Sequence, residues 1–93
     1  MQSMNEIRKM TKVKQDIAKK MVGDLNNEFR DIMFFYKVTS KEICLYTQEM
    51  IFSTWEIHRI EKILANYNYY LDYFRIAEYS PNKFYFEFIA LSE

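Results

Sequence analysis

The sequence contains little glycine, proline, cysteine or histidine, with one residue of each. A single cysteine cannot form a disulfide within the chain, and a loop that cradles phosphate needs several glycines. One glycine and one proline also exclude collagen-like and flexible linker segments. A metal site would have to borrow carboxylates, and no pair of these has a recognised ligand spacing. We therefore expect no metal ion, no cofactor and no small-molecule substrate.

Long apolar runs and an excess of one charge are missing as well. The longest apolar run covers residues 32–36, far fewer than the ~20 residues that span a bilayer. The first ten residues contain no continuous apolar segment of the kind found in secretory signals. Thirteen basic side chains balance thirteen acidic ones, so the formal net charge is zero. We expect a cytoplasmic protein that does not insert into membranes.

Hydrophobic and aromatic residues are abundant, at 49% and 18% of the chain. This composition is typical of a folded chain, and 93 residues are enough for one modest core, so residues 1–93 are predicted to form a single domain. Phenylalanine and tyrosine also have A/T-rich codons, and an A/T-rich genome raises their number without a functional cause. The positions of the rings therefore carry more information than their count.

Residues 3–22 have the pattern of an amphipathic helix. Ser3 and Glu6 match a capping box, in which each residue satisfies a backbone N–H of the other. Apolar residues then recur with a period near 3.6, and lysines occupy most of the opposite side. Gly23 follows, and glycine often ends a helix by adopting a left-handed conformation. We expect the helix to end one residue before this glycine.

The period changes to two from about Phe29, which predicts a strand that is apolar on both faces. A polar stretch at residues 39–42 predicts a tight turn, and a second alternating stretch follows at residues 43–48. These features together indicate a β-hairpin.

A second helix is predicted from residue 53 by two local signals. Ser53 and Glu56 form another capping box, and Phe52 with Ile57 have the spacing of a hydrophobic staple. Apolar residues then recur at helical spacing, and we expect the helix to end near Asn66.

The last third of the chain predicts another hairpin, which turns at residues 80–83. Pro81 and Asn82 fit the second and third positions of a type I turn. Strict alternation before the turn predicts one face with Tyr70, Phe74 and Ile76, and another with Tyr69, Leu71 and Tyr73. The predicted fold is therefore α+β, in the order α-β-β-α-β-β, with a four-stranded antiparallel sheet and two helices packed mainly on one face.

The inventory of reactive side chains does not favour an enzyme. His58 is predicted on the polar side of the second helix, and Cys44 lies within a strand, so the two are not expected to meet. Asp72, Glu78 and Glu87 are more typical of solvated strand positions or protected sheet edges than of an acid–base pair. We predict a protein without catalytic residues.

A binding function follows from the shortage of helices. Two helices on one face leave the other apolar face of the sheet short of cover, and exposed aromatic patches mark interaction sites. We expect docking on another protein, as for a small inhibitor or adaptor of a phage or mobile element, or self-association as a homodimer. The candidate partner-binding residues are Tyr69, Tyr73 and Tyr85.

Nucleic-acid binding is the alternative. Residues 1–20 hold six basic and two acidic side chains, while residues 21–93 hold seven and eleven. A basic helix can contact phosphates, and exposed rings can stack on bases, although an acidic sheet would repel the nucleic-acid backbone. A basic amphipathic helix can also lie on an anionic membrane, but packing on the sheet is the favoured interpretation. The candidate phosphate contacts are Arg8, Lys9, Lys12, Lys19 and Lys20.

Overall fold

The computed structural model describes residues 4–49 and 52–93. Within these residues the order is α1 (Met4–Glu28), β1 (Phe35–Val38), β2 (Ile43–Thr47), α2 (Thr54–Ala65), β3 (Tyr69–Ser80) and β4 (Lys83–Ser92). The strands form one antiparallel sheet in the spatial order β1-β2-β4-β3. The predicted α+β class, element order and four-stranded antiparallel sheet are confirmed. Ser3, one half of the first predicted capping box, lies outside the described residues.

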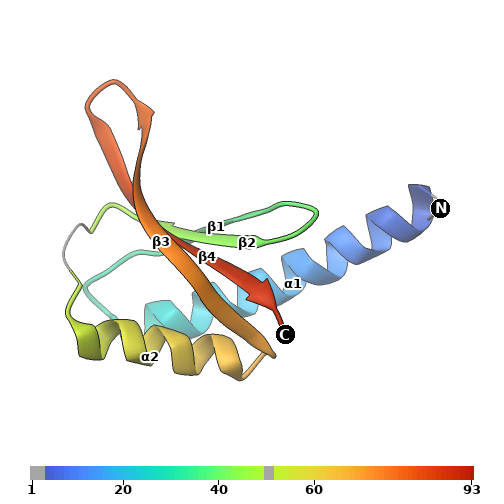
Figure 1. Ribbon diagram of the computed structural model, residues 1–93, viewed down its shortest axis with the longest axis horizontal. Coiled ribbons are helices and arrows are strands. Elements are labelled where there is room, and N and C mark those ends of the chain that lie inside the picture. The colour runs from blue at the N-terminus through green and yellow to red at the C-terminus, as the bar shows by residue number, and fades with distance from the viewer. Residues whose placement is uncertain (1–3, 50–51) are drawn as a thin grey trace.

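Both helices pack against the same face of the sheet, which is seen edge-on above them in Figure 1. The core between these two layers is built from buried residues of α1 and α2 and from alternate residues of the central strands. The strands contribute Ile43, Leu45, Phe86, Phe88 and Ala90 to it. The side chains between these positions therefore point to the opposite face.

Helix α1 is longer than the sequence predicted, and the expected stop at Gly23 is wrong. The helix continues to Glu28, and Gly23 lies on its exposed side, where a Cβ atom would meet nothing within 4 Å. Met21, Leu25 and Phe29 are buried at four-residue spacing and continue the apolar stripe. Burying these three side chains outweighs the cost of about 1 kcal/mol for a glycine inside a helix.

The first strand also begins later than predicted, at Phe35 rather than near Phe29. Phe29 and Phe34 both lie in the core, with ring centroids 5.9 Å apart, so the segment between them folds back toward the sheet. The backbone N–H of Phe34 donates a hydrogen bond of 2.8 Å to the side chain of Asn26 on α1. Residues 29–34 are therefore a connection that is anchored in the core at both ends by Phe29 and Phe34, and its apolar positions resemble a strand in the sequence.

The turn between β1 and β2 forms where it was predicted. The N–H of Thr39 donates to the carbonyl of Glu42 at 3.0 Å, and Val38 pairs with Ile43. The amino group of Lys14 on α1 donates to the carbonyls of Thr39 and Ser40, at 3.2 and 2.8 Å. These bonds tie the end of the hairpin to the helix.

Helix α2 begins and ends as predicted. The N–H of Glu56 donates to the hydroxyl of Ser53 at 3.3 Å, and the N–H of Ser53 donates to the Glu56 carboxylate at 2.9 Å. Both halves of the capping box are therefore present. Asn66 caps the other end, and Ile60 and Leu64 are buried against the sheet.

A β-bulge in β3 changes the predicted faces of this strand. Leu71 pairs with Ala90 and Tyr73 pairs with Ile89, so Asp72 is an extra residue without a partner on β4. An extra residue shifts the alternation by one position. The predicted face sets for this strand are therefore wrong, because Leu71 lies on the same face as Phe74 and Ile76, while Tyr70 lies with Tyr73.

The β3–β4 hairpin extends away from the helices and ends at the predicted turn (Figure 1). Ser80 pairs with Lys83, so Pro81 and Asn82 are the central turn residues. Asn82 has a φ of 65°, however, and a type I turn has a negative φ at this position. The turn is confirmed, but the predicted type is wrong.

Candidate interaction surface

The face of the sheet opposite to the helices, which we call the open face, has no helix against it within the described residues. It is rich in aromatic side chains, because the alternating positions of all four strands bring rings to this side. The open face consists of Phe35, Lys37, Cys44, Tyr46, Tyr70, Tyr73, Arg75, Ala77, Tyr79, Lys83, Tyr85, Glu87, Ile89 and Leu91.

Rings on the open face are partly accessible to solvent. Phe35, Tyr70, Tyr73 and Tyr79 are 42–44% exposed. A group of such rings on an uncovered sheet is the kind of surface that commonly binds another molecule.

Glu87 lies on the open face and is nonetheless 1% exposed. Its carboxylate accepts hydrogen bonds from the Cys44 thiol at 3.0 Å, from Nε of Arg75 at 3.0 Å and from the hydroxyl of Tyr79. These donors come from β2 and β3, on either side of β4, so one side chain links three strands. Such a buried carboxylate is tolerated because its charge is paired and its oxygens are hydrogen-bonded.

The neighbours of Glu87 determine its charge. Burial raises the pKa of this carboxylate, but hydrogen bonds from Tyr79, Cys44 and Arg75 and the charge of Arg75 have the larger combined effect. The pKa of Glu87 is therefore below its ordinary value, and the group is ionised at neutral pH. This ionised carboxylate in turn contributes to raising the pKa of the Arg75 guanidinium.

The two other donors remain protonated at neutral pH. Burial and the hydrogen bond to Glu87 raise the pKa of the Cys44 thiol to about 12. Burial and the same carboxylate raise the pKa of Tyr79. A thiol that keeps its proton is a poor nucleophile.

The rings over Glu87 pack on one another. Tyr46 meets Tyr79 and Tyr85 edge to face, with ring centroids 5.5 Å apart in both pairs, and it stacks on Phe35 at 5.6 Å. The amino group of Lys37 lies 5.5 Å from the ring centre of Tyr79. The open face is therefore an ordered layer of rings with cations beside it.

The predicted partner-binding tyrosines do not share one surface. Tyr73 is exposed and Tyr85 is half-buried, and both lie on the open face. Tyr69 is 7% exposed and belongs to the core on the helix side, so its placement on an exposed patch was wrong. Tyr69 starts β3 before the bulge, where the strand still packs against the helices.

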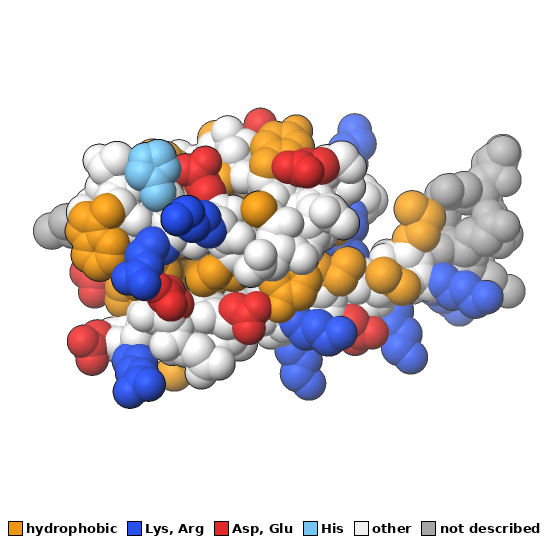
Figure 2. Space-filling model, turned by 90° about the horizontal axis from the view of Figure 1, so that it is seen from below, with side chains coloured by type: hydrophobic (Ala, Val, Ile, Leu, Met, Phe, Trp, Pro, Cys, Tyr) orange, Lys and Arg blue, Asp and Glu red, His pale blue; other side chains and the backbone are white. Residues whose placement is uncertain are grey.

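The predicted phosphate contacts all lie on α1 and are all exposed. Figure 2 shows Lys and Arg side chains along this helix toward its N-terminal end, with apolar side chains beside them. Arg8, Lys12 and Lys19 are spaced by four and seven residues and therefore lie on one side of α1, with Lys9 and Lys20 next to them. Among the described side chains, none of these five cations forms an ion pair within 4.0 Å.

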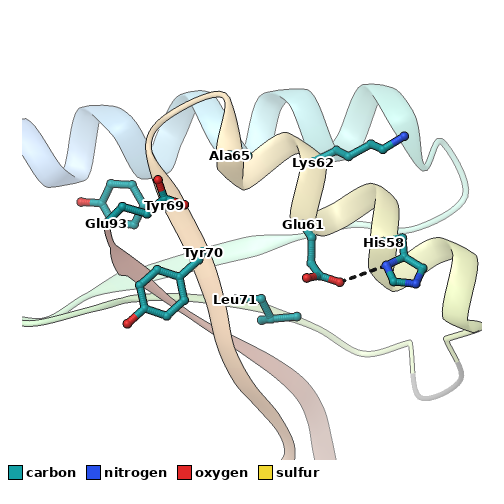
Figure 3. Close-up of a pocket in the computed structure, with 8 residues that line it drawn as sticks. All are labelled: His58, Glu61, Lys62, Ala65, Tyr69, Tyr70, Leu71 and Glu93. Carbon is teal, nitrogen blue, oxygen red and sulfur yellow. Dashed lines mark ion pairs between the residues drawn. The ribbon is translucent and has the colours of Figure 1, made fainter.

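A depression of about 730 Å³ lies between α2 and the start of β3 (Figure 3). His58, on its rim, contacts Glu61 across one helical turn, with 3.2 Å between Nδ1 and Oε1. As predicted, His58 is on the exposed side of α2 and Cys44 is in a strand, so the depression does not bring a thiol and an imidazole together. Among the described residues, no three His, Cys, Asp or Glu side chains meet as they would around a metal ion.

The sequence predicted a solvated strand position or a protected sheet edge for Glu87. That assignment is wrong, because β4 is a central strand and Glu87 pairs with Tyr46 on one side and Arg75 on the other. The signal in the sequence was that Glu87 shares one face of its predicted strand with Tyr85 and Ile89, in a segment that is rich in aromatic residues. Its partners could not be assigned without the register of the sheet.

Comparison with known protein families, with characterised proteins and with solved structures finds no match. Within residues 4–49 and 52–93, neither helix has the length and apolar character needed to cross a membrane.

Proposed function

We propose that this protein is a non-catalytic interaction module whose open face docks on an acidic surface of another protein. The main support is the group of accessible rings Phe35, Tyr70, Tyr73 and Tyr79 on a sheet face without a helix. Aromatic side chains supply large contact areas at low entropic cost.

Charge defines the chemistry of the partner. At the paired positions of the open face, the exposed charged side chains are Lys37, Arg75 and Lys83, and all three are cations. The carboxylate on this face, Glu87, is buried and paired. A partner that places aspartate or glutamate around an apolar centre complements this arrangement.

Ring geometry favours a protein over a nucleic acid on the open face. Bases stack on flat ring faces that are open to solvent. Tyr46, Tyr79 and Tyr85 instead direct their edges and faces at one another. The nucleic-acid alternative therefore rests on the exposed cations of α1, and the test includes it.

The test is a selection of binding peptides from a random displayed library with the protein as bait. Peptides enriched by the wild-type protein are expected to combine acidic and apolar residues. Their affinity, measured by fluorescence anisotropy, should fall at least about tenfold for the variant Tyr73→Ala with Lys37→Glu, because both an anchor ring and a charge are lost.

The matched control is Gln15→Ala with Lys12→Glu, which changes exposed residues of α1 and leaves the open face intact. Peptide binding should be unchanged in this control. Equal binding by the open-face variant would overturn the proposal. Binding of a single-stranded oligonucleotide by the wild type, with loss on Lys12→Glu and a steep dependence on salt, would instead support the nucleic-acid function.

A further inference from the structure

Strand β3 lies at the edge of the sheet and pairs with β4 on one side only. An edge strand presents backbone N–H and C=O groups that can pair with another extended chain. Proteins usually protect such edges with lysine, proline or a bulge. β3 has a bulge at Asp72 and a second register shift at Tyr79, but the regularly paired segment 73–78 between them contains neither lysine nor proline.

Exposed apolar side chains flank this segment on both faces. Tyr73 and Tyr79 lie on the open face, and Phe74 and Ile76 lie on the helix side, where they are 46% and 60% exposed. The hairpin extends beyond the helices here (Figure 1), so neither helix covers these side chains. A strand added at this edge would pair the backbone and bury apolar side chains on both faces.

A second copy of the same segment fits this edge by symmetry. A two-fold axis perpendicular to the sheet makes the two β3 strands antiparallel and keeps the faces matched, so each residue meets one from the same face. The charges of the segment are Arg75 and Glu78, one of each sign and on opposite faces. Like charges then face each other directly only if the axis passes through one of these two residues.

The apolar side chains of α1 do not offer a second copy the same fit. Met10 and Val13 are exposed, but the cations of this helix lie beside them. Two antiparallel copies would bring Arg8 and Lys12 of one chain close to Lys19 and Lys20 of the other, which is unfavourable. The edge of β3 is therefore the better surface for self-association.

We propose that two copies of this protein pair antiparallel through residues 73–78 of β3 and form one continuous sheet. The segment is about 20 Å long at ~3.4 Å per residue. Its centre lies between Arg75 and Ile76, and an axis through Arg75 would bring two guanidinium groups face to face. The axis therefore passes through Ile76, and the two Ile76 side chains lie directly opposite each other. The paired sheet also places two open faces side by side.

This proposal uses the strand edge, whereas the proposed function uses the open face. The two rest on different side chains and can fail separately. Pairing at the edge leaves the open faces of both copies uncovered, so peptide binding and self-association are measured independently.

The test is the mass in solution, measured by sedimentation over a range of protein concentrations. The wild-type protein is expected to reach twice the monomer mass of 11.5 kDa. Ile76→Lys and Ile76→Glu should each weaken dimerisation by at least about tenfold, because like charges then meet near the axis. An equal mixture of the two variants should recover the dimer, because opposite charges then meet.

Val13→Lys is the matched control, because Val13 is 58% exposed on α1 and far from the pairing segment in sequence. This variant should dimerise like the wild type. Circular dichroism of each variant checks that it remains folded. A monomeric wild-type protein would overturn the proposal, and so would folded Ile76 variants that remain dimers.

Discussion

Arg75 and Glu87 lie directly opposite each other on β3 and β4, and Nε of Arg75 donates a hydrogen bond of 3.0 Å to Oε1 of the carboxylate. The Arg75 side chain is 55% exposed, whereas that of Glu87 is 1% exposed. The pair therefore joins a buried charge to a cation that still reaches solvent. A partly solvated guanidinium loses less hydration than a fully buried one, which lowers the cost of placing Glu87 under the rings.

Replacing Glu87 should destabilise the protein more than replacing an exposed carboxylate. Glu87→Ala removes the acceptor of Cys44, Tyr79 and Arg75 and leaves a cavity, so we expect a loss of about 3–5 kcal/mol in the free energy of unfolding. Urea denaturation measures this loss. Glu61→Ala is the control, because Glu61 is exposed on α2 and its contact with His58 is worth less than about 1 kcal/mol.

The same carboxylate predicts a loss of stability in acid. The pKa of Glu87 is lower in the folded protein than its ordinary value of 4.5, so the ionised form stabilises the fold above pH 4.5. This contribution is lost as the pH falls from 4.5 through the folded-state pKa.

Glu87→Gln tests this prediction, because glutamine keeps the shape of the side chain and does not titrate. Thermal unfolding at a series of pH values should show a shallower acid-induced decrease for this variant than for the wild type. Identical pH profiles would show that Glu87 does not link protonation to folding.

Gly23→Ala should stabilise the protein. Gly23 lies inside α1 without a positive φ, and the added methyl group would meet nothing within 4 Å. Alanine is a better helix former than glycine, so we expect a gain of about 0.5–1 kcal/mol in urea denaturation. If Gly23 instead ended the helix in a left-handed conformation, the same substitution would destabilise the protein.

Deletion of Asp72 should be tolerated better than deletion of another residue of β3. Asp72 is the extra residue of the bulge, so its removal leaves Leu71 and Tyr73 on their present faces. We expect a loss below about 2 kcal/mol, caused mainly by the changed twist of the strand. Ala77 is the control, since its deletion from regular pairing moves neighbouring side chains to the wrong face. Comparable losses in the free energy of unfolding for the two deletions would contradict the assignment of a bulge at Asp72.

Short-range signals predicted the parts of the fold that depend on neighbouring residues. The capping box of Ser53 and Glu56 involves atoms only three residues apart, and α2 begins where this motif predicts. The turn at Ser80 and Lys83 depends on local residues in the same way, although its type does not follow from them.

Features that depend on distant residues were predicted less well. Gly23 is a local stop signal, but α1 continues because Leu25 and Phe29 find partners in the core. The bulge at Asp72 has no signature in the sequence, and it decides which tyrosines reach the open face. Of the tyrosines predicted on an uncovered sheet face, Tyr73 and Tyr85 therefore lie on the open face, whereas Tyr69 lies in the core.

The buried position of Cys44 gives this protein a built-in reporter of its own opening. The thiol is 1% exposed, and its pKa of about 12 keeps it protonated at neutral pH. A reagent that modifies thiolates can therefore reach Cys44 only when the open-face side chains around it, including Tyr79 and Glu87, move apart. Because the chain has a single cysteine, the rate of labelling would time the opening of this layer of side chains without any engineered probe.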